Sequence, residues 1–330
     1  MKLSVLDQSP IRQGGTATQA LHETLALAKH VESLGYHRFW VSEHHNMTSL
    51  AGSAPEVLLG AIGAHTQHMR IGSGGVMLPH YSAFKVAETF SVLSTLYPNR
   101  VDVGVGRAPG GDMDTARILA TDGRPKFERF PVLVEQLRTM LNDRDFRPRV
   151  APVPPSPPPM WILGSSHESA ILAAQYGLPY NFALFINSQM IPELFDLYRS
   201  EFQPSDSYPG QITEPQTILT VDVLCAETEE EAQRLAMSRR LTFLRFAHRE
   251  QNVQVPPVEE AVNYPYNQQE LQFLNTKFQQ AAIGTPTQVR AKLEKLAEDF
   301  GTDEIMTVTI TYDFQARLRS YELLAEAFGM

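Results

Sequence analysis

The sequence predicts a closed barrel of eight parallel strands surrounded by helices, the TIM (β/α)8 barrel. Strand-like and helix-like patterns alternate from end to end, which indicates parallel strands joined by crossovers. Eight such units in 330 residues suit one barrel domain spanning 1–330. An open Rossmann-type sheet is the alternative. It is weakened because Asp7-Gln8-Ser9-Pro10 follows the first strand, where a glycine-rich phosphate turn would be expected.

The predicted strands are short apolar runs rich in β-branched and aromatic residues and bounded by turn residues. Gly72, Gly74 and Gly75 interrupt the third of them. The strands are expected at residues 3–6, 39–42, 70–77, 101–105, 160–163, 181–186, 218–225 and 305–310.

The predicted helices carry apolar residues at helical spacing, and several have clear start or stop signals. Leu21, Leu25, Ala28 and Val31 form one such stripe, which Gly35 ends. The proline-dense segment 147–159 is expected to be an extended surface connection. Residues 249–284 are expected to form an insertion or lid after the seventh strand. The helices are expected at residues 18–34, 55–64, 83–96, 127–141, 164–176, 192–202, 229–246, 271–282, 284–300 and 315–328.

Composition and charge exclude several classes of function. Hydrophobic residues make up 43% and charged residues 20%, which permits a normal core. The net charge of -9 comes without a basic block, so nucleic acid and anionic membranes are poor partners. Cys225 is the single cysteine, so the chain contains no internal disulfide. Neither a signal peptide nor a membrane-spanning run is apparent, and we expect a cytoplasmic protein.

The second strand runs into three ionisable residues, Glu43, His44 and His45. Loops at the carboxyl ends of barrel strands carry the chemistry of this fold. Neighbouring side chains on a strand face opposite ways, so only one histidine is expected to face the barrel mouth as an acid or base. A structural histidine held by a neighbouring carboxylate is an equally good interpretation. A metal site is the minority interpretation, because its other ligands would have to come from other strands.

Two further groups follow later strands. Ser73, Gly74 and Gly75 lie in a run without bulky side chains, which suits either a flat ring against the backbone or a tightly packed barrel corner. Arg107 follows the fourth strand, where it can pair with an anion or with Asp112 or Asp114.

After the fifth strand, Ser165, Ser166 and Ser169 open a helix whose start can either bind an anion or be simply capped. Because the two strands are consecutive, Arg107 and this helix start are expected to converge on one phosphate.

These runs resemble the bacterial luciferase-like flavin-dependent monooxygenases, above all the single-chain, luciferase-alpha-like members. The resemblance is carried in order by residues 40–45, 71–79, 103–107, 166–169 and 173–179. It implies a barrel that binds reduced FMN supplied by a separate NAD(P)H:FMN reductase. Oxygen would add to the flavin to give a C4a-peroxide, which oxidises an aldehyde or a similar small organic substrate.

By the same resemblance, His44 matches the catalytic acid/base, and Gly74-Gly75 matches a non-prolyl cis peptide beneath the flavin ring. Arg107, Ser166 and Ser169 match the phosphate clamp. Ser73 and Ser165 belong to the same runs and are also expected to contact the cofactor. Gly106 stands where light-emitting members carry a reactive cysteine, which argues against light emission.

Two other functions stay open on the same fold. One is hydride transfer with a deazaflavin (F420), whose acidic tail would call for extra cations at the barrel mouth. The other is a flavin-binding protein without turnover. The resemblance also implies a homodimer, with helices 55–64 and 83–96 expected to face the partner.

Overall fold

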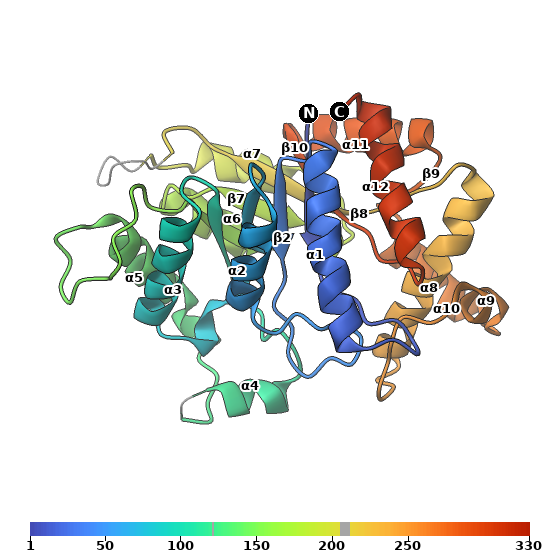
Figure 1. The fold of residues 1–330 in the computed structure, drawn as a ribbon, viewed down its shortest axis with the longest axis horizontal. Helices are drawn as coiled ribbons and strands as arrows, with labels where there is room; N and C mark the ends of the chain where they lie inside the picture. The colour runs from blue at the N-terminus through green and yellow to red at the C-terminus, as the bar shows by residue number, and fades with distance from the viewer. Residues whose placement is uncertain (121, 205–211) are drawn as a thin grey trace.

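The computed structural model, which describes residues 1–120, 122–204 and 212–330, confirms the TIM barrel. Parallel pairings run from β10 through β1, β2, β3, β5, β6 and β7 to β8, and β8 pairs with β10 to close the barrel (Figure 1). The strands are β1 (Lys2–Asp7), β2 (Arg38–Val41), β3 (Arg70–Ser73), β4 (Val76–Met77), β5 (Val101–Gly106), β6 (Met160–Gly164), β7 (Tyr180–Ala183), β8 (Thr217–Cys225), β9 (Ala282–Gly284) and β10 (Glu304–Val308).

Helices cover the outside of the barrel, and α8, α9 and α10 lie together at one side of it (Figure 1). The α-helices are α1 (Ala17–Ser33), α2 (Pro55–His65), α3 (Ala83–Leu96), α4 (Met113–Leu119), α5 (Phe130–Asn142), α6 (His167–Gln175), α7 (Glu193–Ser200), α8 (Glu229–Ala247), α9 (Val258–Asn263), α10 (Gln268–Lys277), α11 (Pro286–Phe300) and α12 (Phe314–Phe328). Short 3-10 turns occur at Leu78–His80 and Phe127–Arg129.

Alternation along the strands builds two cores. On β1, Leu3 and Val5 pack outward into the large cluster beneath the helices, while Leu6 faces the barrel interior. The interior cluster also contains Trp40, Trp161 and Met306. These bulky residues fill the barrel, so an open space remains only where the inward residues become small or polar.

The structure differs from the predicted elements in four places. Residues 70–77 form two strands, because the chain turns at Gly74-Gly75. The helix expected over residues 271–282 ends at Lys277, and Ala282–Gly284 pairs with β8 as β9. Helices α4 and α9 lie in segments expected to be loops; each is too short to show a full apolar period. Among the described residues, no helix is both long and apolar enough to span a membrane.

Candidate active site

A cavity of about 690 Å³ lies at the carboxyl ends of the strands. Its size suits an organic cofactor or substrate. Most of its wall is apolar, and Arg107 and Glu168 are the charged side chains among the described residues that line it. The lining residues are Leu6, Trp40, Gly74, Gly75, Met77, Gly106, Arg107, Ala108, Pro109, Phe127, Phe130, Pro131, Leu163, Gly164, Ser165, Ser166, Glu168, Ser169, Leu172, Asn181, Ala183, Phe185, Ile186, Thr220 and Met306.

The turn between β3 and β4 gives this cavity a wall of bare backbone. The Gly74-Gly75 peptide bond is cis, and the Gly74 N–H donates to the Val41 carbonyl at 2.7 Å. A Cβ on Gly74 would lie 2.5 Å from Leu6 Cδ1, and one on Gly75 would lie 2.6 Å from Leu163 Cδ1. A Cβ on Gly75 would also lie 2.8 Å from the Gly104 carbonyl oxygen, so that position requires glycine, whereas one on Gly74 would displace the Leu6 side chain. The backbone of both glycines lines the cavity.

Ser73 does not line the cavity, although the sequence suggested that it contacts a cofactor. Its hydroxyl donates to the Gly104 carbonyl at 2.8 Å and accepts from the Gly104 N–H at 3.0 Å. The side chain is fully buried between β3 and β5. Ser73 thus holds the two strands together where their direct pairing is interrupted.

Arg107 and the start of α6 meet at the cavity wall, as predicted from the strand order. Arg107 Nη1 lies 2.7 Å from Glu168 Oε2, and both side chains are more than half exposed. The alternative pairings of Arg107 with Asp112 or Asp114 are wrong. Asp112 caps α4 and accepts from Asn46, while Asp114 pairs with Arg117. Arg107 is therefore held at the cavity by a weak surface pair that an anion can replace.

Three serines lie around this helix start, and one of them caps the helix. Ser165, Ser166 and Ser169 all line the cavity. The Ser169 hydroxyl accepts from the Ser166 N–H at 3.3 Å and donates to the Ser166 carbonyl at 2.7 Å. Ser169 therefore caps the helix locally, which is the alternative to anion binding considered from the sequence. The positive end of the α6 dipole still faces the cavity.

Glu43 and His45 form a buried group that holds the wall in place. Glu43 Oε1 lies 2.7 Å from His45 Nε2 and accepts from the Tyr81 hydroxyl at 2.7 Å. Glu43 Oε2 accepts from the Met77 N–H at 3.0 Å. His45 is therefore the histidine that a neighbouring carboxylate satisfies, and Glu43 fixes the segment after Gly74-Gly75 through Met77.

The side chains of His44 and His45 point in different directions and have different partners. Its Nδ1 lies 3.0 Å from the Ser42 hydroxyl, and its N–H donates to the Gly52 carbonyl at 2.8 Å. The ring does not line the cavity, but it follows Val41, whose carbonyl binds Gly74, by three residues. Burial lowers the pKa of His44 to about 4, and the charges of His45 and Arg239 add to this effect against that of Glu43. His44 is therefore a neutral imidazole at neutral pH.

Several cavity residues were not found by sequence reasoning. Asn181 on β7 and Thr220 on β8 hydrogen bond to each other at 2.8 Å inside the barrel. A polar residue at an inward position of an apolar strand was the available signal. Phe127 and Phe130 form part of the wall from the segment before α5 and the start of that helix, and no local pattern distinguishes them from core residues.

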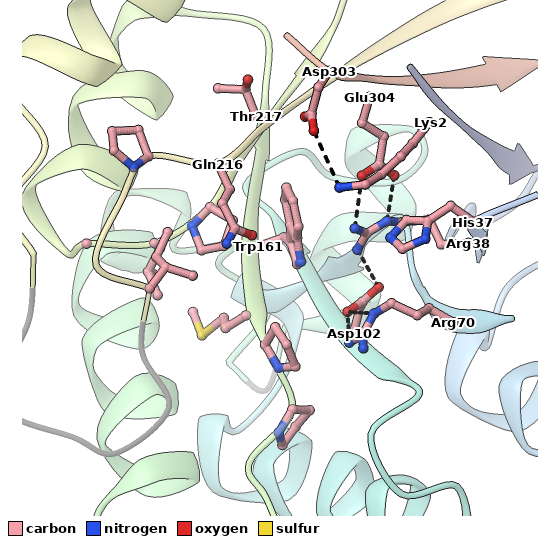
Figure 2. Close-up of a pocket in the computed structure, with 18 of the residues that line it drawn as sticks. Lys2, His37, Arg38, Arg70, Asp102, Trp161, Gln216, Thr217, Asp303 and Glu304 are labelled. Carbon is pink, nitrogen blue, oxygen red and sulfur yellow. Dashed lines mark hydrogen bonds and ion pairs between the residues drawn. The ribbon is translucent and has the colours of Figure 1, made fainter. Parts of the chain in front are cut away.

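A second hollow, of about 670 Å³, lies at the amino-terminal end of the barrel (Figure 2). Its buried charges neutralise one another: Arg38 lies 2.8 Å from Asp102 and 2.6 Å from Glu304, and Arg70 lies 2.5 Å from Asp102. At its rim Lys2 pairs with Asp303 (Figure 2). This end of a barrel usually serves stability, and its paired charges are explained without a ligand.

No group of three or more His, Cys, Asp or Glu side chains within the described ranges is placed to hold a metal ion. The chemistry of the carboxyl-end cavity is instead that of an organic ligand: an apolar space, a bare backbone wall, and one guanidinium beside a helix start.

Comparisons with known proteins agree with this geometry. Residues 1–304 match the family model described as luciferase-like monooxygenase. An uncharacterised Bacillus subtilis protein, YwcH, is 43% identical over 100% of this chain and 99% of its own length. A luciferase-like monooxygenase of Escherichia coli is 38% identical, covering 97% and 95%. The N-acetyl-S-alkylcysteine monooxygenase of B. subtilis is 37% identical, covering 99% and 98%.

Among solved structures, apo-MsnO8 superposes with a TM-score of 0.91 at 40% identity, covering 99% of this chain and 98% of that one. Two more distant structures share the fold. A Pseudomonas putida 3,6-diketocamphane monooxygenase component in complex with FMN has a TM-score of 0.72 at 17% identity, covering 99% and 97%. An F420-dependent secondary alcohol dehydrogenase has a TM-score of 0.66 at 15% identity, covering 99% and 97%. The chain is thus an oxidoreductase that belongs to the luciferase-like monooxygenase family.

Proposed function

We propose that this protein is an FMN-dependent monooxygenase that inserts one oxygen atom of O2 into a small organic substrate. The observation that carries the proposal is that one cavity joins the Gly74-Gly75 wall to Arg107 and the start of α6. A flat isoalloxazine ring needs a wall without side chains, and a phosphate needs a cation and free backbone N–H groups. The residues present therefore fit FMN.

The roles of the residues follow from their positions. Arg107 and the first N–H groups of α6 would hold the phosphate, with Glu168 displaced from Arg107. The backbone of Gly74 and Gly75 would support the ring. Reduced FMN supplies two electrons, so that one oxygen atom enters the substrate and the other leaves as water. His44, a neutral imidazole whose ring does not line the cavity, would exchange a proton with the reacting groups through an intervening group.

The remaining parts of the proposal concern supply and location. We also propose that FMN is reduced by a separate NAD(P)H:FMN reductase in the cytoplasm and is then transferred to this protein. Hydride transfer with F420 is the second candidate, and Arg107 is the cation that its polyanionic tail would meet among the described residues lining the cavity.

The test is an anaerobic titration with reduced FMN, followed by mixing with oxygen. We expect saturable binding and flavin reoxidation slower than that of free reduced FMN. The same titration with reduced F420 provides the comparison, and tighter binding of F420 would reverse the cofactor assignment. Absence of binding, or reoxidation at the rate of free flavin, would contradict the monooxygenase proposal.

A further inference from the structure

A buried ion pair lies one layer above the cavity, on the side of β8. Thr220 lines the cavity, and Asp222, two residues later, faces the barrel interior in the same way. Asp222 is 7% exposed, and its Oδ1 lies 2.7 Å from Arg239 Nε on α8. A carboxylate near the carboxyl end of β8 thus fixes a guanidinium from α8 beside this part of the barrel.

Arg239 has N–H donors without a hydrogen-bond acceptor among the described residues. Asp222 engages its Nε, and no residue in the described ranges accepts from either Nη nitrogen. The side chain is 22% exposed, so these nitrogens are accessible to a small molecule. The two Nη groups of an arginine form a planar fork that matches a carboxylate.

Helix α10 supplies a second cation that interacts with this pair. Lys277, at the end of α10, donates to the Phe185 carbonyl at 2.9 Å and to the Ile186 carbonyl at 2.6 Å. Phe185 and Ile186 line the cavity, and the Phe185 N–H donates to the Thr220 carbonyl. Burial lowers the pKa of Lys277, the charge of Asp222 opposes this shift and that of Arg239 adds to it.

The charge of Arg239 also acts on His44. The mouth has two cations, Arg239 and Lys277, against the one carboxylate of Asp222, so a single added negative charge would balance it. The FMN phosphate does not meet this need, because Arg107 and the α6 start provide its site on the β5 and β6 side.

We propose that Arg239 binds a carboxylate of the organic substrate, with Asp222 as the positioning residue that orients its guanidinium. The inference rests on the proposed function and narrows it: the substrate class is a small apolar molecule that carries one carboxylate. The carboxylate would be held at the β8 side of the mouth, leaving the apolar part of the substrate to extend into the cavity beside the flavin.

The test uses linear carboxylates of four to ten carbons and the corresponding neutral amides, titrated by calorimetry into the FMN-loaded protein. We expect the best carboxylate to bind at least tenfold more tightly than its amide. Arg239→Gln should abolish this preference without changing amide binding, and Arg239→Lys should retain part of it. Arg234→Gln is the matched control, because Arg234 lies exposed on the same helix and pairs with Glu231 and Glu259.

FMN affinity is measured by flavin fluorescence in every variant. It distinguishes failure of the proposed function from failure of the role proposed for Arg239. Failure of the wild-type protein to bind FMN would contradict the proposed function itself. FMN binding with equal affinity for carboxylate and amide would overturn only the role of Arg239. Loss of FMN binding in Arg239→Gln would also overturn it, since Arg239 would then serve the flavin. If Arg239→Gln does not fold, Arg239→Lys and the wild-type comparison decide.

Discussion

At the scale of single residues, His44 and His45 show how adjacent identical side chains acquire different roles. Glu43 satisfies His45, whereas the His44 ring contacts only the Ser42 hydroxyl among the hydrogen-bonding groups described. A buried carboxylate fixes one ring as part of the scaffold, and burial keeps the other neutral. At neutral pH the His44 ring is therefore free to accept a proton, as a weaker base than an imidazole that titrates near pH 7.

Replacing His44 by Gln should reduce turnover about 10²–10⁴-fold, the usual contribution of a general acid or base. FMN affinity should stay within about twofold of wild type, because the ring lies outside the flavin cavity. Steady-state rates and flavin fluorescence measure the two effects. His68→Gln, at an exposed position, is the control. Unchanged turnover in His44→Gln would remove His44 from the chemistry.

The pKa of His44 gives a prediction on pH. Because this pKa is lowered to about 4, His44 should cause no inflection in the rate between about pH 6 and 8 and a falling limb near pH 4. As pH falls, His44 in the unfolded chain takes up its proton near its ordinary pKa of 6.5, before the folded chain does. The contribution of His44 therefore destabilises the fold as pH falls from 6.5 towards 4. Unfolding titrations of wild type and His44→Gln should diverge in this range and converge above it.

Arg107 and Glu168 give opposite predictions for FMN. Arg107→Ala should weaken FMN binding by about tenfold or more, since a hydrogen bond to a charged group contributes about 1.5–3 kcal/mol. Glu168→Gln should strengthen it, because the carboxylate competes for Arg107 and repels the phosphate. Riboflavin, which lacks the phosphate, should respond to neither change. Arg117→Ala on α4 is the control, and equal effects on FMN and riboflavin would contradict the assignment of a phosphate site.

At the scale of elements, the two ends of the barrel strands have different roles: the amino-terminal ends stabilise the fold, and the carboxyl ends form the cavity. Burial would raise the pKa of Asp102 on β5, but Arg38 and Arg70 outweigh it and hold the pKa below its usual value. This group ties the amino-terminal ends of β2, β3, β5 and β10 together. The opposite ends of the same strands carry the cavity.

Asp102→Asn should therefore cost about 3–5 kcal/mol of unfolding free energy, because it leaves Arg38 and Arg70 buried with an incomplete partner. Urea unfolding measures this cost. Asp303→Asn should change stability by less than about 1 kcal/mol, since its pair with Lys2 is exposed. FMN affinity of the folded Asp102→Asn protein should match wild type. A large loss of FMN affinity would mean that the two ends of the barrel are coupled.

Sequence patterns predicted those elements whose length allows a period to show. All eight barrel strands and the long helices were found, while α4, α9 and the three-residue β9 were missed because each is too short. Strand order also placed Arg107 beside Ser166. Contacts that depend on three-dimensional packing could not be predicted from the sequence. They are the ion pair of Arg107 with Glu168, the hydrogen bonds of Ser73 to Gly104, and the ion pair of Asp222 with Arg239.

At the scale of the whole molecule, the helices α2 and α3 expose apolar side chains. Val57 on α2 is 72% exposed, and Leu96 on α3 is 61% exposed. An association surface is expected to carry such residues. These residues lie on the two helices expected to face a partner, and we therefore propose that the protein forms the homodimer implied by the resemblance.

Sedimentation at micromolar concentration should therefore show a dimer, and the double variant Val57→Asp, Leu96→Asp should shift it towards monomer. Ile118→Asp is the matched control, because Ile118 is 85% exposed on α4, away from α2 and α3. A wild-type monomer, or a dimer unaffected by the double variant, would contradict this arrangement.

The central claim is that the carboxyl-end cavity seats FMN, and a crystal structure of the protein soaked with FMN tests it most directly. The flavin ring should lie against the backbone of Gly74 and Gly75, with the phosphate at Arg107 and the first N–H groups of α6. FMN bound at the amino-terminal hollow, or a cavity that stays empty at saturating FMN, would contradict the claim.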